Sequence, residues 1–310
     1  MSITACLFPG QGSQFAGMGK PLAETFPTAR QVFEEADEVL GFSLSRLCFE
    51  GPEEELKLTE NTQPALVAVS TAAWRVAAEQ GLTPDYVAGH SLGEYSALVA
   101  AGGLKLADAL VLVRKRGRYM QEAVPPGAGA MAAILKLPEG RLEAILEEAA
   151  QGEVVSAANY NSPEQIVIAG HAAAVQRAMA LCKSAGAKRA VALPVSAPFH
   201  CPLMTPAQDR LRAELDATEF RDLEFGLINN WAAREVRTGR EAREGLYQQI
   251  PNPVRWSSSM QLLAGKGVER WFEVGAGTVL AGLLRNILPG TKAARLGEPG
   301  DYEVLHATTV

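Results

Sequence analysis

The chain has 310 residues, of which 47% are hydrophobic and 21% are charged, and it carries a formal net charge of −6. This balance allows a large buried core, in one big domain or two unequal ones. It argues against general binding to nucleic acid, although a local basic patch could still meet an acidic partner. The first residues lack a basic start followed by a long apolar run, and Arg75 interrupts the most apolar helix-like stretch. We therefore expect no signal peptide, no membrane span and a cytoplasmic location.

The first part of the chain alternates predicted strands with predicted helices. The expected elements are a buried strand at 3–8, helices at 28–40 and 64–80 with an acidic linker between them, a strand at 86–88, a helix ending at 101 and a helical segment at 106–124. This alternation predicts a parallel sheet covered by helices.

The strand at 86–88 runs into Gly89-His90-Ser91-Leu92-Gly93, a Gly-x-Ser-x-Gly pattern. Glycines on both sides of Ser91 allow a tight turn that exposes the hydroxyl at the end of the strand and points the next backbone N–H toward the helix start. Ser91 is therefore the candidate nucleophile. On this pattern alone, the alternative is a tight turn with a capping serine.

The strand at 3–8 also ends in a glycine-rich loop, Phe8-Pro9-Gly10-Gln11-Gly12-Ser13-Gln14. A glutamine flanked by glycines at the carboxyl end of a strand lies where open α/β sheets bind ligands, so N–H groups of this loop could face one. A surface turn is the alternative.

The segment 106–124 carries three arginines and a lysine, and helical periodicity separates them. At about 100° per residue, its apolar residues share one face and Arg116 lies beside that face. The other cations, Arg114, Lys115 and Arg118, fall on the outer, solvated side. A cation at a buried edge needs a partner, because an unpaired charge there is strongly unfavourable. The pattern by itself favours a structural ion pair between Arg116 and an Asp or Glu.

Pro125-Pro126-Gly127 marks a change of organisation. The elements expected after it are a strand at 128–135, a helix at 138–150, strands at 154–159 and 165–168, a helix at 172–185 and a strand at 189–193. This βαββαβ order is the ferredoxin-like pattern. A unit this complete indicates an inserted subdomain at 127–197, within a larger domain formed by 1–126 and 198–310.

Beyond the insertion we expect a helix from 205, a strand at 225–228, helices at 240–249 and 253–264, a strand at 271–274 and, after a glycine-rich turn, a helix to 287. The last twenty residues show only weak strand character and receive no assignment. The cysteines are scattered, without CxxC or metal-type spacing, at Cys6, Cys48, Cys182 and Cys201. We therefore expect reduced thiols, no disulfide and no metal.

A serine nucleophile needs a base, and the chain has four histidines. His90 is adjacent to Ser91, and neighbouring side chains diverge at such a turn; His171 follows a predicted hairpin and is expected at the surface; His306 lies in the tail. His200 lies where the chain re-enters the larger domain, after a Pro-punctuated apolar run that would fix its position. We choose His200, because a Ser–His pair is the usual way to activate a hydroxyl. A structural histidine is the alternative.

Several ordered motifs resemble one family. They are FPGQGSQ at 8–14, TQPAL at 62–66, GHSLGE at 89–94, RGRYM at 116–120, NYNSPEQIVIAG at 159–170, FH at 199–200, NPVRW at 252–256 and EVGAG at 273–277. Together they resemble the malonyl-CoA:acyl-carrier-protein transacylases, from about residue 3 to residue 290. That family has an α/β-hydrolase-like core with a parallel sheet and an inserted ferredoxin-like subdomain, in agreement with the order of elements above.

The resemblance implies a role for individual residues. Ser91 would be the nucleophile, His200 the base, and the backbone carbonyl of Gln249 would take the third triad position. The backbone N–H groups of Gln11 and Leu92 would form the oxyanion hole. Arg116 would bind the malonyl carboxylate. The other implied substrate-binding residues are Gln63, His90, Met120 and Phe199.

The reaction implied by the resemblance moves a malonyl group from malonyl-CoA to the phosphopantetheine thiol of holo acyl carrier protein, through a malonyl-serine intermediate and with ping-pong kinetics. It needs no metal or redox cofactor, and we expect a monomer. The chain departs from the common family pattern at Ala276, where Pro is frequent, and at Phe199, where bacterial enzymes often have Ser. Phe-His resembles malonyl-selective polyketide acyltransferases. Fatty-acid synthesis is the first expectation for the pathway, and a trans-acting malonyltransferase of polyketide synthesis is the alternative.

Two other functions remain open on the sequence. An α/β-hydrolase, either an esterase or a thioesterase, would send the acyl group to water and would normally place its histidine late in the chain, which favours His306. A non-catalytic carrier-binding or scaffold module would leave Ser91, His200 and Arg116 without a common purpose.

Overall fold

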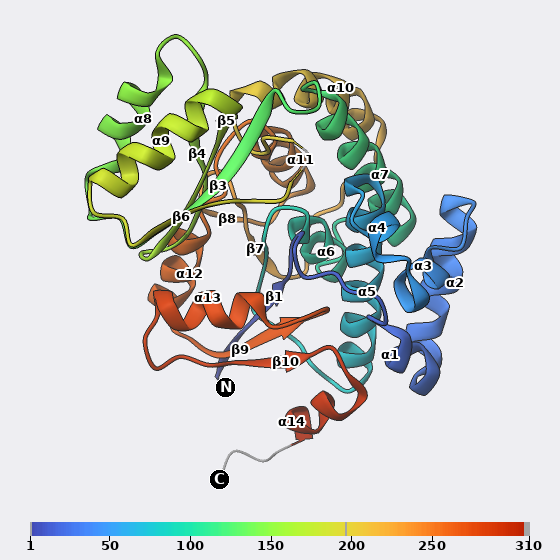
Figure 1. Cartoon of the computed structure of the whole chain (residues 1–310). Coiled ribbons are helices and arrows are strands. Elements are labelled where there is room, and N and C mark those ends of the chain that lie inside the picture. Colours follow the sequence, from blue (N-terminus) through green and yellow to red (C-terminus); the bar gives the residue numbers. More distant parts are fainter. Residues whose placement is uncertain (1, 196, 307–310) are drawn as a thin grey trace.

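The computed structural model describes residues 2–195 and 197–306, and a six-stranded sheet runs through its larger part (Figure 1). The strand order is β10 (Ala293–Leu296), β9 (Val268–Val274), β1 (Ile3–Phe8), β2 (Tyr86–Gly89), β7 (Gly226–Ile228) and β8 (Glu235–Val236). Neighbouring strands are parallel from β10 to β7, and β8 runs antiparallel to β7. The expected α/β fold with a parallel sheet is confirmed.

Helices cover both faces of this sheet, because successive residues of each strand point to opposite sides. On β1, Cys6 and Phe8 join one apolar layer, whereas Ala5 and Leu7 join the other. The first layer contains α1 (Lys20–Thr25), α2 (Pro27–Leu40), α3 (Leu44–Glu50), α4 (Glu53–Leu56), α5 (Thr59–Glu79), α6 (Gly93–Ala100), α7 (Leu106–Glu122), α10 (Thr205–Ala217, preceded by the 3-10 turn η1 at Pro202–Met204) and α11 (Gly239–Gln249). The second layer contains α12 (Trp256–Gly265) and α13 (Val279–Ile287).

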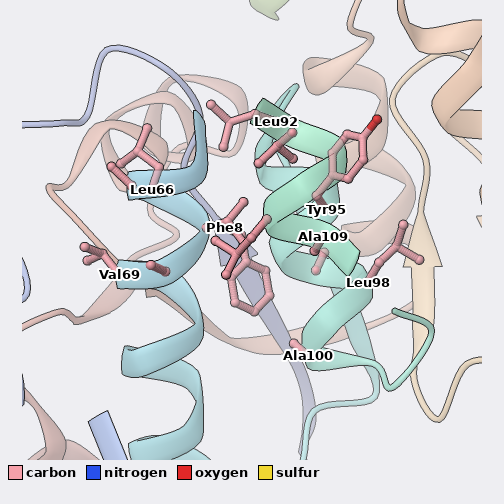
Figure 2. Packing of buried hydrophobic residues seen from close by; sticks show 14 of the residues in the cluster. Phe8, Leu66, Val69, Leu92, Tyr95, Leu98, Ala100 and Ala109 are labelled. Atoms are coloured by element: carbon pink, nitrogen blue, oxygen red, sulfur yellow. The ribbon is translucent and has the colours of Figure 1, made fainter. Parts of the chain in front are cut away.

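The centre of the first layer holds the ends of β1 and β2 in place. Figure 2 shows Phe8 of β1 between Leu66 and Val69 of α5 on one side and Tyr95 and Leu98 of α6 on the other. Burying an aromatic or branched aliphatic side chain contributes about 1.5–3 kcal/mol. This packing fixes the carboxyl edge of the sheet, where two glycine-rich turns follow β1 and β2.

The acidic linker expected between 41 and 64 is wrong. That segment contains α3 and α4, and α5 begins at Thr59 rather than at Pro64. The helices α3 and α4 have seven and four residues, which is too short for a helical period to appear in the sequence. They are held by a few buried apolar side chains, among them Leu47 and Leu56.

A second sheet follows α7 in the chain and is antiparallel throughout its described pairings. Its order is β4 (Val155–Ser162), β5 (Gln165–His171), β3 (Gly129–Leu135) and β6 (Arg189–Ala192), and its two helices are α8 (Leu142–Ala150) and α9 (Ala172–Ser184). Ile134 and Val175 belong to a separate apolar cluster between this sheet and its helices, whereas Met131 and Val167 on the opposite face join the main core. The chain order is the expected βαββαβ order. Figure 1 shows α8 and α9 on the outer side, so the inner face of the sheet meets the rest of the molecule.

The last twenty residues, which received no assignment, contain β10, the 3-10 turn η2 (Pro299–Tyr302) and α14 (Glu303–His306). They are tied to the body of the protein, since Tyr302 donates its hydroxyl hydrogen to Ala73 O of α5 at 2.9 Å. Residues 307–310 of this tail lie outside the described residues, as do residues 1 and 196 of the expected domains 1–126, 127–197 and 198–310.

None of the helices in the described part of the chain is long and apolar enough to cross a membrane. The four cysteines are free and buried.

Candidate active site

Ser91 lies on the sharp turn that joins β2 to α6, at the carboxyl edge of the parallel sheet. The flanking glycines serve close packing: a Cβ on Gly89 would lie 1.9 Å from Gly93 C, and a Cβ on Gly93 would lie 2.2 Å from Phe8 O. Ser91 itself has φ of 52°, in the left-handed region that residues with a side chain rarely adopt. The glycines therefore let the ends of β1 and β2 and the start of α6 approach one another, and Ser91 adopts the unusual backbone conformation.

Ser91 is hydrogen-bonded to the predicted base. Its Oγ lies 2.7 Å from His200 Nε2, and His200 Nδ1 lies 2.9 Å from the backbone carbonyl oxygen of Gln249. A carbonyl oxygen can only accept, so Nδ1 carries the ring hydrogen and the lone pair of Nε2 faces the serine hydroxyl. Burial lowers the pKa of His200 to about 3, and the nearby Arg116 cation is the second cause. The imidazole is therefore neutral at physiological pH and can accept a proton from Ser91.

The other histidines are engaged elsewhere. His90 Nε2 lies 2.8 Å from Asn161 Oδ1, and burial lowers the pKa of this histidine. His171 is half-buried, and its Nδ1 accepts the backbone N–H of Val154, just before the start of β4. His306 is exposed on α14 and contacts Gln80. The choice of base by elimination agrees with these positions.

Arg116 projects from α7 into the same site and is 2% exposed. Its Nη1 donates to Gln63 Oε1 at 2.8 Å, and its Nη2 donates to Gln249 Oε1 at 2.9 Å and to Ser91 Oγ at 3.1 Å. No carboxylate among the described residues is within ion-pair distance of it, so the structural ion pair favoured by periodicity is not formed. Burial lowers the pKa of this guanidinium, but an arginine remains charged in proteins. The site therefore holds a buried cation whose hydrogen-bond acceptors among the described residues are neutral oxygens and which lies 5.7 Å from the centre of the Tyr95 ring.

Two backbone N–H groups beside Ser91 are available as donors. Among the described residues, the amides of Gln11 and Leu92 donate to no other group, whereas the Ser91 N–H donates to Asn230 Oδ1 at 2.7 Å. Gly10 permits the loop after β1 to approach the elbow, since a Cβ there would lie 2.4 Å from a backbone oxygen of that turn. The two predicted oxyanion-hole residues thus lie next to the nucleophile with their donors free.

A cavity of about 230 Å³ lies between the two sheets and contains these groups. The larger part of the molecule contributes Gln11, Gln63, His90, Ser91, Leu92, Arg116, Met120, Phe199 and His200, and the second sheet contributes Met131, Ala133, Asn159, Asn161, Gln165 and Val167. A second cavity of about 500 Å³ adjoins it, because Gln11 and Val195 line both. Gln249 is fully buried behind the first cavity and reaches the site through its contacts with His200 and Arg116. The structure therefore brings all the predicted site residues together.

Sequence reasoning does not identify two residues that hold the elbow, Asn230 and Glu94. Asn230 Nδ2 donates to Gly89 O at 2.7 Å, and its Oδ1 accepts the Ser91 N–H. Glu94 is 0% exposed, and its Oε2 accepts from the Asn230 N–H at 3.0 Å and from Gln249 Nε2 at 2.9 Å. A signal for Glu94 does exist, because an acid within an otherwise apolar helix must find buried partners. For Asn230 the signal is its place just after β7, at the same edge as Ser91.

Metal ligands do not gather in the described part of the chain: no group of three or more His, Cys, Asp and Glu side chains could hold an ion there.

The known proteins to which this chain is similar include acyl transferases. Residues 6–286 match the model of the acyl transferase domain family. The chain is 49% identical over 300 residues to the malonyl CoA-acyl carrier protein transacylase of Escherichia coli strain K12, covering 96% of this chain and 97% of that protein. It is 48% identical over 305 residues to the protein of the same name from Bacillus subtilis strain 168, covering 98% and 96%.

Two solved structures of malonyl-transferring enzymes are similar to this structure. An acyl carrier protein S-malonyltransferase from Vibrio cholerae superposes with a TM-score of 0.96 at 46% identity, covering 98% of this chain and 100% of that one. A malonyl-transacylase in complex with its type II PKS acyl-carrier protein superposes with a TM-score of 0.95, also at 46% identity, covering 98% and 99%.

Proposed function

The chain belongs to the malonyl CoA-acyl carrier protein transacylases, within the acyl transferase domain family, and we propose that it carries the malonyl group on Ser91 between the two thiols of its reaction. It is an acyltransferase that moves malonyl from malonyl-CoA to acyl carrier protein. A serine intermediate makes the kinetics ping-pong. The observation that carries the proposal is the hydrogen-bonded series from Gln249 O through His200 to Ser91 Oγ, with Arg116 on the same oxygen.

In the first half-reaction, His200 Nε2 takes the proton of the Ser91 hydroxyl as Oγ attacks the thioester carbonyl of malonyl-CoA. The Oγ–C bond forms, and the negative charge that develops on the carbonyl oxygen is stabilised by the N–H groups of Gln11 and Leu92. As the C–S bond breaks, the departing sulfur takes the proton from Nε2. Coenzyme A leaves, and malonyl-Ser91 remains.

In the second half-reaction the same groups act in reverse. His200 Nε2 takes the proton of the phosphopantetheine thiol on the carrier, and the sulfur attacks the malonyl ester. The C–Oγ bond breaks, and Oγ regains its proton from His200. Both halves need proton transfer and acyl exchange alone, so we propose that no metal or redox cofactor takes part.

Arg116 selects the malonyl group through its terminal carboxylate. A guanidinium can bind a carboxylate with two parallel hydrogen bonds, and malonyl supplies the negative charge that the amide partners of Arg116 lack. Gln63 holds Nη1 of this arginine, and His90, Met120 and Phe199 complete the wall of the acyl cavity. The bound carboxylate also offsets the effect of the cation on the base, so the pKa of His200 should rise when malonyl binds.

Intact-mass analysis tests the proposal. After mixing with malonyl-CoA, the protein should gain the mass of one malonyl group, and holo acyl carrier protein should remove that mass and acquire it. Ser91→Ala should gain nothing. Rapid loss of the adduct to water without carrier would favour the hydrolase, and a protein that binds carrier without ever forming the adduct would favour the scaffold.

We also propose the fold type, the oligomeric state, the location and the pathway of this enzyme. The core is α/β-hydrolase-like, supported by five parallel strands with the nucleophile after β2, and 127–197 is an inserted ferredoxin-like subdomain, supported by the order β4-β5-β3-β6. The protein is a monomer of the cytoplasm, where free buried thiols are usual. Its pathway is fatty-acid biosynthesis, with polyketide synthesis as the alternative because of Phe199.

A further inference from the structure

The side-chain amide of Gln249 lies between a buried cation and a buried acid. Its Oε1 accepts from Arg116 Nη2 at 2.9 Å, and its Nε2 donates to Glu94 Oε2 at 2.9 Å. The same Nε2 donates to Ser91 O at 3.0 Å. None of these contacts involves the backbone carbonyl of Gln249, which is bound to His200. One residue therefore serves the base through its main chain and the cation through its side chain.

Chemistry fixes the orientation of this amide. If oxygen and nitrogen exchanged places, the NH2 group would face the guanidinium donor and the carbonyl would face the Glu94 carboxyl oxygen, so two attractive contacts would become repulsive. Gln249 therefore presents an acceptor to Arg116 while its nitrogen is held on the other side, by Glu94 Oε2 at 2.9 Å, by Ser91 O at 3.0 Å and by Asn230 Oδ1 at 3.4 Å. The amide therefore connects Glu94 to Arg116, with its nitrogen toward Glu94 and its oxygen toward Arg116.

Glu94 is well placed to hold that link. It is 0% exposed, and Oε2 is also fixed by the Asn230 N–H at 3.0 Å. Glu94 Oε1 has no hydrogen-bond partner among the described residues. A proton on Oε1 would leave Oε2 as an acceptor, so the contact with Gln249 survives in either protonation state.

We propose that Glu94 and the side-chain amide of Gln249 are positioning residues for acyl-group selection, in which Glu94 orients the amide and the amide oxygen holds the Arg116 guanidinium beside Ser91. This inference rests on the proposed function, because it concerns how that reaction distinguishes malonyl from an uncharged acyl group. A guanidinium free to leave its place could still neutralise a carboxylate, but it would bind it in a less defined position relative to the thioester.

Gln249→Met tests the side chain alone, since any residue at this position keeps the carbonyl that binds His200. The quantity to measure is the ratio of kcat/KM for malonyl-CoA to kcat/KM for acetyl-CoA. It should fall by about 10- to 100-fold, the size of one hydrogen bond to a charged group. Loss of the contact with Ser91 O affects both substrates and cancels in the ratio. Gln248→Met is the matched control, because the neighbouring Gln248 side chain contacts the surface residue Glu244, and it should leave the ratio unchanged.

Two further variants separate positioning from general damage. Glu94→Gln keeps an acceptor oxygen and should retain most of the malonyl preference. Glu94→Leu removes that oxygen and should lose part of the preference, less than Gln249→Met does, because Ser91 O and Asn230 Oδ1 still accept from Gln249 Nε2. In an Arg116→Ala background, adding Gln249→Met should change the ratio by less than about twofold, because the residue through which it acts is gone. Thermal unfolding of each variant establishes that it is folded.

The inference is overturned if Gln249→Met lowers kcat/KM for malonyl-CoA and for acetyl-CoA equally. It is also overturned if Gln249→Met still lowers the ratio of the two values in the Arg116→Ala background. If Glu94→Leu does not fold, Glu94→Met, which is unbranched like glutamate, replaces it in the test of Glu94, and Gln249→Met with its control Gln248→Met decides the role of the amide. Failure of the proposed function is distinguishable, since in that case the unmodified enzyme itself would not form malonyl-Ser91 by intact mass.

Discussion

Arg116 Nη2 lies 3.1 Å from Ser91 Oγ, so the buried cation and the reacting hydroxyl share a hydrogen bond. An acyl group attached to Ser91 begins at that oxygen, and the terminal carboxylate of malonyl is only a few bonds away from it. The Arg116 cation, which we propose binds the malonyl carboxylate, therefore contacts the reacting oxygen itself and does not lie in a distant part of the cavity.

Ser91→Ala should abolish formation of the acyl-enzyme, and His200→Ala should lower turnover by several orders of magnitude, since losing the base of such a pair is nearly as severe as losing the nucleophile. Steady-state transfer to holo carrier measures both effects. His306→Ala is the control and should remain near normal. A dead His306→Ala variant beside an active His200→Ala variant would restore the hydrolase interpretation.

Arg116→Ala should lose malonyl transfer while keeping or gaining acetyl transfer. Removing one partner of a buried charge pair costs about 3–5 kcal/mol, which corresponds to a fall of about two to four orders of magnitude in kcat/KM for malonyl-CoA. Acetyl escapes this loss because it brings no charge into the cavity. Arg116→Lys should recover only part of the activity, since an ammonium cannot make the two parallel hydrogen bonds.

The measurement is kcat/KM for both substrates on the folded Arg116 variants. A parallel loss of the two activities would mean that Arg116 only maintains the structure. Unchanged malonyl transfer would mean that another group recognises the carboxylate.

Glu94 should make the enzyme less stable as the pH rises. Burial raises the pKa of Glu94 to about 7 from 4.5, so between these values the folded protein holds a proton that the unfolded chain releases. The stability that this proton contributes is complete below about pH 4.5 and is lost as the pH rises through 7. At about 1.4 kcal/mol per pKa unit, the loss can reach about 3 kcal/mol.

Glu94→Gln removes this dependence. Its free energy of unfolding, measured with denaturant, should improve relative to the original chain by about 1–3 kcal/mol between pH 5 and pH 8. Glu34→Gln on the exposed side of α2 is the matched control. An equal difference between Glu94→Gln and the original chain at both pH values would contradict the assignment.

Charge reversal at Lys183, Lys188 and Arg189 should weaken the carrier half-reaction. These exposed cations lie at the end of α9 and the start of β6, where they can meet an acidic carrier despite the net negative charge of the enzyme. KM for the carrier should rise, with a steep dependence on salt, while the rate of Ser91 malonylation by malonyl-CoA stays the same. Lys20→Glu on α1, on the other side of the molecule (Figure 1), is the control. Equal losses in both half-reactions would show that the cluster is only structural.

Local patterns in the sequence were sufficient for much of this site. The strand, the Gly-x-Ser-x-Gly turn and the helix after it are adjacent in the chain, and helical periodicity alone put Arg116 at the buried edge of α7. Periodicity could not show its partners, because Gln63 and Gln249 come from other helices that tertiary packing brings together. It therefore favoured a carboxylate where the structure has amide oxygens.

Residues that act through contacts between distant parts of the chain could not be predicted from the sequence for the same reason. Glu94 and Asn230 are 136 positions apart in the chain, yet they are hydrogen-bonded under the elbow. The role of the Gln249 carbonyl came only from resemblance, since any residue has such a carbonyl and no sequence pattern marks it. The short helices α3 and α4 were missed because each forms two turns or fewer and is held by its neighbours.

Because Ser91 has a positive φ, the residue that would be most stable at this position is not the residue that the reaction needs. A left-handed backbone costs a residue with a Cβ about 1–2 kcal/mol, whereas glycine adopts it without that steric penalty. At position 91 glycine would relax the turn between β2 and α6 and at the same time remove the attacking oxygen. A mutation that increases stability at this position therefore removes the nucleophile, and the need for acyl transfer accounts for a serine in that conformation.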